Sequence, residues 1–112
     1  MLMFVYDNDC REEVLDNGVR RKIKGYINDL MLVEMVWGKG MEGAVHSHPH
    51  RQCTYVISGS FESNMNGEKA VLKAGDCVYT ESGIAHGLIA LEDAGVIIDI
   101  FTPCREDFIA TK

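Results

Sequence analysis

The sequence contains four cysteines, and no two of them are spaced as a Cys-x-x-Cys pair. Their irregular spacing gives no support for a zinc ribbon or a redox-active dithiol. We therefore interpret Cys10, Cys53, Cys77 and Cys104 as buried free thiols. Free thiols are typical of a reducing compartment, so we expect the protein in the cytoplasm.

Long apolar runs and basic clusters are also missing. The apolar run at the N-terminus is short and is followed by acidic residues, which excludes a signal sequence, and no segment approaches the length of a membrane span. The 11 Lys and Arg residues are scattered in a chain of net charge -6, which argues against a nucleic-acid or anionic membrane partner. An anionic small-molecule substrate would therefore need a local positive centre, such as a metal ion or one well-placed arginine.

Helical periodicity is almost absent from the chain. Its 112 residues, 46% of them hydrophobic and 25% charged, fit one globular domain over residues 1–112. Short β-rich runs alternate with Gly, Asn and Asp turns, which predicts an all-β fold, a double-sheet β-sandwich or barrel. The predicted strands are 3–6, 19–24, 30–37, 53–57, 60–65, 69–72, 77–80, 85–90 and 96–101. Single helical turns are expected at 11–15 and 105–108, and Asn66-Gly67 predicts a two-residue hairpin turn.

A cluster of imidazole side chains is the strongest functional signal. His46 and His48 are two residues apart, so on a strand they would share a face, and Gln52 follows the turn that Pro49 favours. With His86 they would supply three imidazoles and an amide oxygen, a set that suits Fe, Mn, Ni, Co or Zn. The alternatives are a chance His-x-His pair on an exposed strand and a core histidine at position 86.

The spacing of these residues resembles the two motifs of the cupin superfamily. The first is Gly40-x5-His46-x-His48-x3-Gln52-x6-Gly59, and the second is Gly75-x5-Glu81-x-Gly83-x2-His86. The sequence departs from the usual pattern at Gln52, Glu81 and Ala90, where the family favours Glu, Pro and Asn. The resemblance implies a small jelly-roll domain with His46, His48, Gln52 and His86 as ligands of a divalent transition metal.

The replacement of Glu by Gln52 changes the charge of the expected site. Three neutral imidazoles and a neutral amide leave the charge of a bound dication uncompensated, which strengthens it as an anion receptor. The alternative is that Gln52 marks a metal-free, sugar-binding relative that has lost the ligand by drift.

A closer resemblance, over about residues 18–108, is to the pectin-degradation cupins of the KdgF type. It is carried by His-Ser-His-Pro-His at 46–50 and by Asp-x-Phe-x-Pro-x-Arg-Glu-Asp-Phe at 99–108. The resemblance implies Asp99, Phe101 and Arg105 as catalytic residues and a homodimer. It also implies ring opening, without redox change, of 4,5-unsaturated monouronates from pectin or alginate to linear 5-keto-4-deoxyuronate.

The residues of the last strand agree in part with these roles. Asp99 falls inside an apolar run, on the face of Ile97 and Phe101, where a buried carboxylate is costly without a partner. Asp99 could instead be satisfied by backbone amides, and Arg105 could be a surface residue paired with Glu106 or Asp107.

Two other function classes fit the same ligands. One is a metal-dependent cupin dioxygenase, which would consume O₂. The other is a cupin that binds a sugar acid without converting it. The sequence leaves the metal, and the pectin or alginate origin of the sugar, open.

Overall fold

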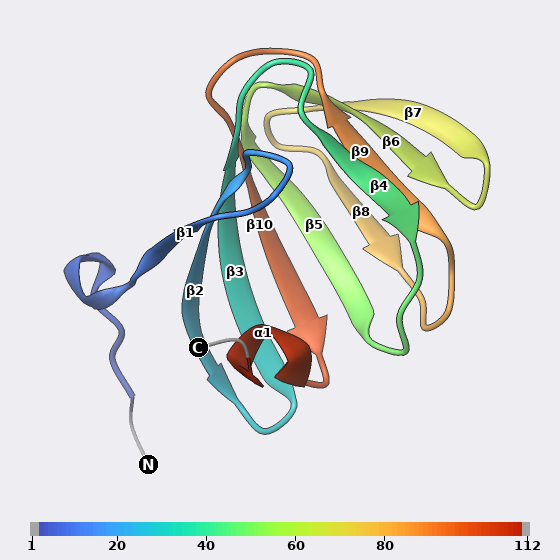
Figure 1. Cartoon of the computed structure of the whole chain (residues 1–112). Helices are drawn as coiled ribbons and strands as arrows, with labels where there is room; N and C mark the ends of the chain where they lie inside the picture. Colours follow the sequence, from blue (N-terminus) through green and yellow to red (C-terminus); the bar gives the residue numbers. More distant parts are fainter. Residues whose placement is uncertain (1–2, 111–112) are drawn as a thin grey trace.

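Two antiparallel sheets packed face to face form the protein, as the computed structural model of residues 3–110 shows (Figure 1). One sheet has six strands in the order β1-β2-β3-β10-β5-β8, and the other has four in the order β4-β9-β6-β7. This arrangement confirms the predicted all-β sandwich. The elements are η1 Asp7–Asp9, β1 Glu12–Val14, β2 Arg20–Ile27, β3 Leu30–Trp37, β4 Glu42–His46, β5 Arg51–Ser58, β6 Ser60–Met65, β7 Glu68–Lys73, β8 Cys77–Thr80, β9 His86–Ala90, β10 Gly95–Thr102 and α1 Glu106–Ala110.

The turn between β6 and β7 has the predicted form. Asn66 and Gly67 have φ values of 53° and 91°, and they join two strands in continuous antiparallel register. A type I′ turn requires positive φ at both central residues, which this dipeptide tolerates. The prediction of a helical turn at 105–108 is also close, since α1 begins one residue later and packs against the inner residues of β2, β3 and β10.

Two predictions in the N-terminal half are wrong, and one strand was not predicted. Residues 3–6 form no strand, and Phe4 there is 75% exposed, so this apolar run has no sheet to join. Residues 11–15 are not helical, because β1 pairs with β2 in register and its acidic side chains face the basic ones of that strand. The strand β4 was not predicted, since its sequence contains a glycine and little apolar alternation.

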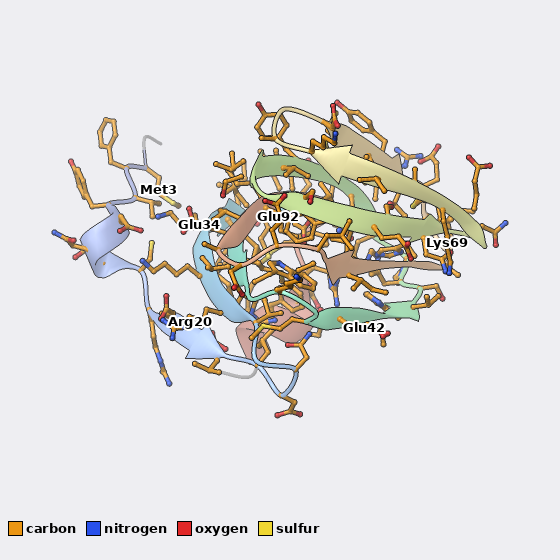
Figure 2. All side chains as sticks on the ribbon, turned by 90° about the horizontal axis from the view of Figure 1, so that it is seen from above. Met3, Arg20, Glu34, Glu42, Lys69 and Glu92 are labelled. Carbon is orange, nitrogen blue, oxygen red and sulfur yellow. The ribbon has the colours of Figure 1, made fainter. Side chains whose placement is uncertain are left out.

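The core between the sheets follows the alternation of β3 and β10. Met31, Val33 and Trp37 on β3 and Ile97 and Phe101 on β10 are all at most 4% exposed, and they share the inner face. Figure 2 shows the side chains of the two sheets from above, at 90° to the view of Figure 1. Asp99 lies in the same inner row as Ile97 and Phe101 and is 5% exposed, as its position in the sequence predicts.

The four cysteines are free thiols, as predicted, but only Cys104 is buried. Cys10 and Cys53 are partly exposed and Cys77 is exposed. Cys53 and Cys77 lie on β5 and β8 with side chains on the outer face of the sheet, which explains their exposure. Among residues 3–110, no helix has the length and apolar character to cross a membrane.

Candidate metal centre and its cavity

Three histidines from separate segments meet at one end of the sandwich. His46 ends β4, His86 begins β9, and His48 lies in the connection from β4 to β5. The ring centroids of His46 and His86 are 4.7 Å apart, and those of His48 and His86 are 4.8 Å apart. The candidate ligand atoms all lie within 4.8 Å of one another, which could hold a metal ion. His46 and His48 converge although they do not share a strand, so the expected geometry of this pair is wrong while the cluster is present.

An irregularity in the pairing of β4 with β9 brings His46 opposite His86. Gly43 pairs with Leu88 and His46 with His86, so Ala44 and Val45 together face the single residue Gly87. Such a bulge changes which face the following side chain occupies. A Cβ on Gly87 would lie 2.8 Å from the carbonyl oxygen of Gly43, so the two strands approach closely only because position 87 is glycine.

Main-chain carbonyls set the orientation of all three rings. The Nδ1 atoms of His46, His48 and His86 lie 2.8, 3.0 and 2.9 Å from the carbonyl oxygens of Ala44, His50 and Ile84. A carbonyl only accepts, so each Nδ1 carries the proton and each Nε2 keeps its lone pair in the neutral ring. This is the tautomer that coordinates a metal through Nε2.

The surroundings of two Nε2 atoms fit a bound cation. His86 Nε2 is buried and has no hydrogen-bond partner among the described residues. His48 Nε2 lies 3.0 Å from Gln52 Oε1. When the ring is neutral both atoms are acceptors, so no hydrogen bond joins them, and a cation between them could bind both lone pairs. Burial lowers the pKa of both His48 and His86 and so favours this neutral form. A dication held by His46, His48, His86 and the Gln52 oxygen would use these lone pairs.

Gln52 connects the histidines to the buried carboxylate. Its Nε2 donates to Thr54 Oγ1 at 2.9 Å and to Asp99 Oδ1 at 3.0 Å, and the Thr54 hydroxyl also donates to Asp99 Oδ1. Only the amide nitrogen can donate to a carboxylate, which fixes the orientation of the Gln52 side chain. Asp99 Oδ2 accepts no hydrogen bond within the described part of the chain, so one oxygen is anchored and the other is available in the cavity.

Burial raises the pKa of Asp99 to about 6 from its usual 3.8. The hydrogen bonds from Thr54 and Gln52 and the charge of Arg105 act in the opposite direction but do not cancel the loss of water. Asp99 is therefore satisfied by side chains and not by backbone amides. A carboxyl with a pKa near the working pH can both take and return a proton.

Phe101 and Arg105 form the wall beside this centre. The Phe101 ring lies 5.9 Å from that of His48 and is 2% exposed. The Arg105 side chain is 10% exposed and binds Asp107 through two nitrogens at 2.9 and 2.8 Å, while its guanidinium carbon lies 4.2 Å from the Phe108 ring centroid. Arg105 thus pairs with Asp107, one of the two expected alternatives, but it does so inside the cavity wall and not at the surface.

A cavity of about 340 Å³ joins these residues. His46, Gln52, His86, Asp99, Phe101 and Arg105 all line it. The structure therefore brings the predicted ligands and the predicted tail residues to a single site. Its walls are mostly apolar, which favours a small molecule with a few fixed polar contacts.

Sequence reasoning missed two contributors to the site. Thr54 holds Asp99, and its position two residues after Gln52 on β5 was a signal, because a polar residue on the buried face of a strand needs a partner. His50 acts on His48 through its main-chain carbonyl, which side-chain identity does not reveal.

The fold and this histidine centre are those of a cupin. The model of the cupin domain matches residues 32–101, more than half of the chain, and the chain therefore belongs to the cupin family.

Within that family the chain is similar to the KdgF proteins. It is 40% identical over 110 residues to the pectin degradation protein KdgF of Dickeya dadantii (strain 3937), which covers 97% of this chain and 100% of that protein. The structure of KdgF from Halomonas sp. superposes with a TM-score of 0.92 at 34% identity, over 96% of this chain and 99% of that one. An RmlC-like cupin from Shewanella frigidimarina NCIMB 400 has a TM-score of 0.90 at 36% identity, over 96% of both chains.

Replacement of Gly87 by alanine should weaken metal binding. The added Cβ would meet the Gly43 carbonyl and push β4 from β9, which separates His46 from His86. We expect a loss of affinity of about 10- to 100-fold, the range found when the support of a ligand is disturbed. Titration of the purified variants with Zn²⁺ or Ni²⁺ by calorimetry measures the change.

Gly67→Ala is the matched control for Gly87→Ala. Gly67 has a positive φ that favours glycine, unlike Gly87, but a Cβ there meets nothing within 4 Å. This variant should lose stability through backbone strain alone and keep its metal affinity. Equal metal affinity in the two variants would contradict the role of the close approach at Gly87.

Replacement of Asp99 by asparagine should stabilise the metal-free protein at neutral pH. The pKa of Asp99 is higher in the folded chain, about 6, than in the unfolded chain, so its contribution is intact below about pH 4 and is lost as pH rises toward 6. A difference of about two pH units corresponds to about 3 kcal/mol, so we expect Asp99→Asn to gain up to about 3 kcal/mol at pH 7.5 and nothing at pH 3.5. Denaturant unfolding at both pH values tests this.

Asp107→Asn provides a control of opposite sign. The Arg105 side chain lowers the pKa of Asp107, so that carboxylate stabilises the fold above its unfolded pKa and the effect disappears in acid. This variant should lose stability at pH 7.5. A gain in both variants, or a gain in Asp99→Asn that does not depend on pH, would refute the assignment.

Proposed function

We propose that the protein is a metal-dependent enzyme that opens the ring of 4,5-unsaturated monouronates to give linear 5-keto-4-deoxyuronate. The observation that carries this proposal is Asp99, a buried carboxylate with one free oxygen that lines the same cavity as His46 and His86. The 40% identity to the pectin degradation protein KdgF supports a sugar acid from pectin as the substrate, one of the two origins that the sequence leaves open.

The charge of the site suits an acidic sugar. The protein carries a net charge of -6. Histidine binds a metal through its neutral imidazole and glutamine carries no charge, so these ligands would leave a bound dication its full charge. When bound, a divalent Ni, Zn, Fe, Mn or Co ion would attract the substrate carboxylate and polarise its ring oxygen. Arg105 adds a second positive group in the wall, 5.1 Å from the Phe101 ring centroid.

Asp99 is the proposed base. It takes the proton from the anomeric hydroxyl, the C1–O bond to the ring oxygen breaks, and C1 becomes an aldehyde. The electron pair remains on the former ring oxygen as an enolate, and a proton delivered to C4 converts this enolate to the ketone. The reaction is an isomerisation, so no oxidant or reductant is needed.

The neighbours of Asp99 hold it for this transfer. Thr54 and Gln52 both donate to Oδ1, which leaves Oδ2 to approach the substrate hydroxyl. Phe101 restricts water on the His48 side, and Arg105 would donate charge-assisted hydrogen bonds to the substrate carboxylate after a partial exchange with Asp107. The homodimer that the family resemblance implies stays a prediction.

Asp99→Asn should abolish most of the ring-opening rate while the metal stays bound. Loss of a general base costs about 10²–10⁴-fold, and asparagine can still accept the bonds of Thr54 and Gln52 through Oδ1. The measurement is the loss of absorbance of the conjugated enol ether under anaerobic conditions, with the linear keto acid identified by nuclear magnetic resonance. Metal content is measured in the same samples.

The controls separate the proposal from the two other function classes. His86→Ala should lose both metal and activity, and its rate gives the spontaneous opening of the sugar. A dioxygenase would stall without O₂, and a non-catalytic binder would match this spontaneous rate. Wild-type turnover in Asp99→Asn would show that another group is the base.

A further inference from the structure

The inner faces of the two sheets meet in rows, and one contact shows which rows face each other. Thr80 on β8 donates to the sulfur of Met65 on β6 at 3.4 Å. Thr80 pairs with Gln52, and Met65 pairs with His86. The row that contains His86 on one sheet therefore faces the row that contains Gln52 on the other. The next inner row of each sheet begins two residues along each strand, about 6.6 Å deeper in the sandwich.

Ser63 and Asp99 both lie in this next row, on opposite sheets. Ser63 on β6 comes two residues before Met65 on the same face of the strand. Asp99 on β10 pairs with Thr54, which comes two residues after Gln52 on β5. Both Ser63 and Asp99 line the cavity, so they stand on its two walls at the same depth. The proposed reaction uses Asp99 and gives Ser63 no role.

The surroundings of the Ser63 side chain are apolar. Ser63 is 4% exposed, and the residues paired with it on the neighbouring strands are Ala70 and Leu88. Phe61 and Met65 flank it on the inner face of its own strand. Of these side chains only Met65 has an acceptor, a weak thioether sulfur that already accepts a hydrogen bond. An apolar residue would fill this position without leaving a polar group unpaired.

The Ser63 hydroxyl is unpaired, yet the protein does not cover it. It makes no hydrogen bond within residues 3–110. The polar side-chain atoms of these residues that lack both a hydrogen bond and accessible surface are Arg21 Nε, Trp37 Nε1, His50 Nδ1 and His86 Nε2. Ser63 Oγ is not one of them, so it is open to the cavity that Ser63 lines. Buried hydroxyl groups normally find a partner, and a ligand in the cavity can supply one.

We propose that the Ser63 hydroxyl binds the C2–C3 edge of the sugar acid and so positions C1 beside Asp99. The inference rests on the proposed function, because it takes the histidine row as the place of the substrate carboxylate and ring oxygen. In a pyranose ring the C2–C3 bond lies directly opposite the bond from C5 to the ring oxygen. When the ring oxygen and the carboxylate on C5 face the histidines, the hydroxyl groups of C2 and C3 point into the next row, toward Ser63.

The chemistry of serine suits this edge of the sugar. A serine hydroxyl both donates and accepts hydrogen bonds, as a sugar hydroxyl does, and it carries no charge. A carboxylate is a better partner for Arg105 or for a cation held by the histidines. The apolar side chains around Ser63 also make a charged group costly at this depth. Ser63 is therefore a specificity-determining residue for the neutral edge of the substrate.

Two ligands of the Zn²⁺-loaded protein isolate this contact. 4,5-Dihydroxytetrahydropyran-2-carboxylate, in the configuration of the sugar, has the carboxylate, the ring oxygen and the two hydroxyl groups that correspond to those of C2 and C3. Tetrahydropyran-2-carboxylate differs from it only in lacking these two hydroxyl groups. Neither ligand has an anomeric hydroxyl or a double bond, so neither ring can open. Isothermal titration measures the Kd of each ligand without any need for turnover.

The test variants are Ser63→Ala, which removes the hydroxyl, and Ser63→Cys, which fills the same space with a weaker hydrogen-bonding group. Each should raise the Kd of the dihydroxy ligand about 3- to 10-fold, as expected for one lost hydrogen bond. Neither should change the Kd of tetrahydropyran-2-carboxylate. Ser60→Ala is the matched control, because it removes a hydroxyl of the same strand that binds Glu92 outside the cavity. It should bind both ligands as the wild type does.

Each outcome decides the inference. An unchanged Kd of the dihydroxy ligand in Ser63→Ala overturns it, and so does an equal loss for both ligands, which marks a structural effect. A loss in Ser63→Ala without a loss in Ser63→Cys also overturns it, because the effect is then one of volume. If Ser63→Ala does not fold, Ser63→Cys decides alone.

The same measurements separate the inference from the proposed function. The expected losses, without ring opening of the unsaturated sugar, support the contact with Ser63 and refute the proposed function. A wild type that binds both ligands equally, or binds neither, overturns the inference. Ring opening of the unsaturated sugar, measured separately, still tests the proposed function in that case.

Discussion

The position of β10 between β3 and β5 is the constraint on which the site depends. Hydrogen bonding on both sides leaves β10 no freedom to shift, and its register sets Asp99 beside Thr54 and Phe101 beside Gln52. A shift of one residue would turn Asp99 to the outer face and bring Ile98 or Ile100 to the cavity. The chemistry of the site therefore follows from strand pairing that is stabilised along the whole sandwich.

At Asp99, the loss of water on burial and the hydrogen bonds from Thr54 and Gln52 act on the carboxyl group in opposite directions. Burial makes the charged form of Asp99 costly, while the donors on β5 keep that form accessible near neutral pH. Burial likewise lowers the pKa of His48 and His86, because the positively charged ring loses contact with water. Few charged groups line the cavity of this acidic protein, namely Asp99, Arg21 and Arg105, and a cation bound by the imidazoles would add to them.

Much of this could be predicted from the sequence, and the misses have physical causes. The alternation of side chains predicted β3 and β10 and placed Asp99 on the face of Ile97 and Phe101, because successive side chains of any strand point to opposite faces. Motif spacing located the histidines, yet it missed the bulge that aims His46, since Ala44 and Val45 carry no local signal for an extra residue. The strand β1 was not predicted, because it is stabilised by charge pairing with β2 and not by the strand propensity of its own residues. Ser63 was not predicted to be a site residue, because only the packed structure shows that its hydroxyl lies at the cavity without a partner.

The carbonyls that hold the histidine rings have an evolutionary consequence. In each case the acceptor is a backbone atom two residues away, at Ala44, His50 or Ile84, so no substitution can remove it while the local backbone persists. Side chains around the centre can therefore drift without loss of the ligand tautomers. Proteins with this fold can therefore exchange residues such as Gln52 or Asp99 and acquire new reactions, because the orientation of the three imidazoles depends on the backbone and not on these side chains.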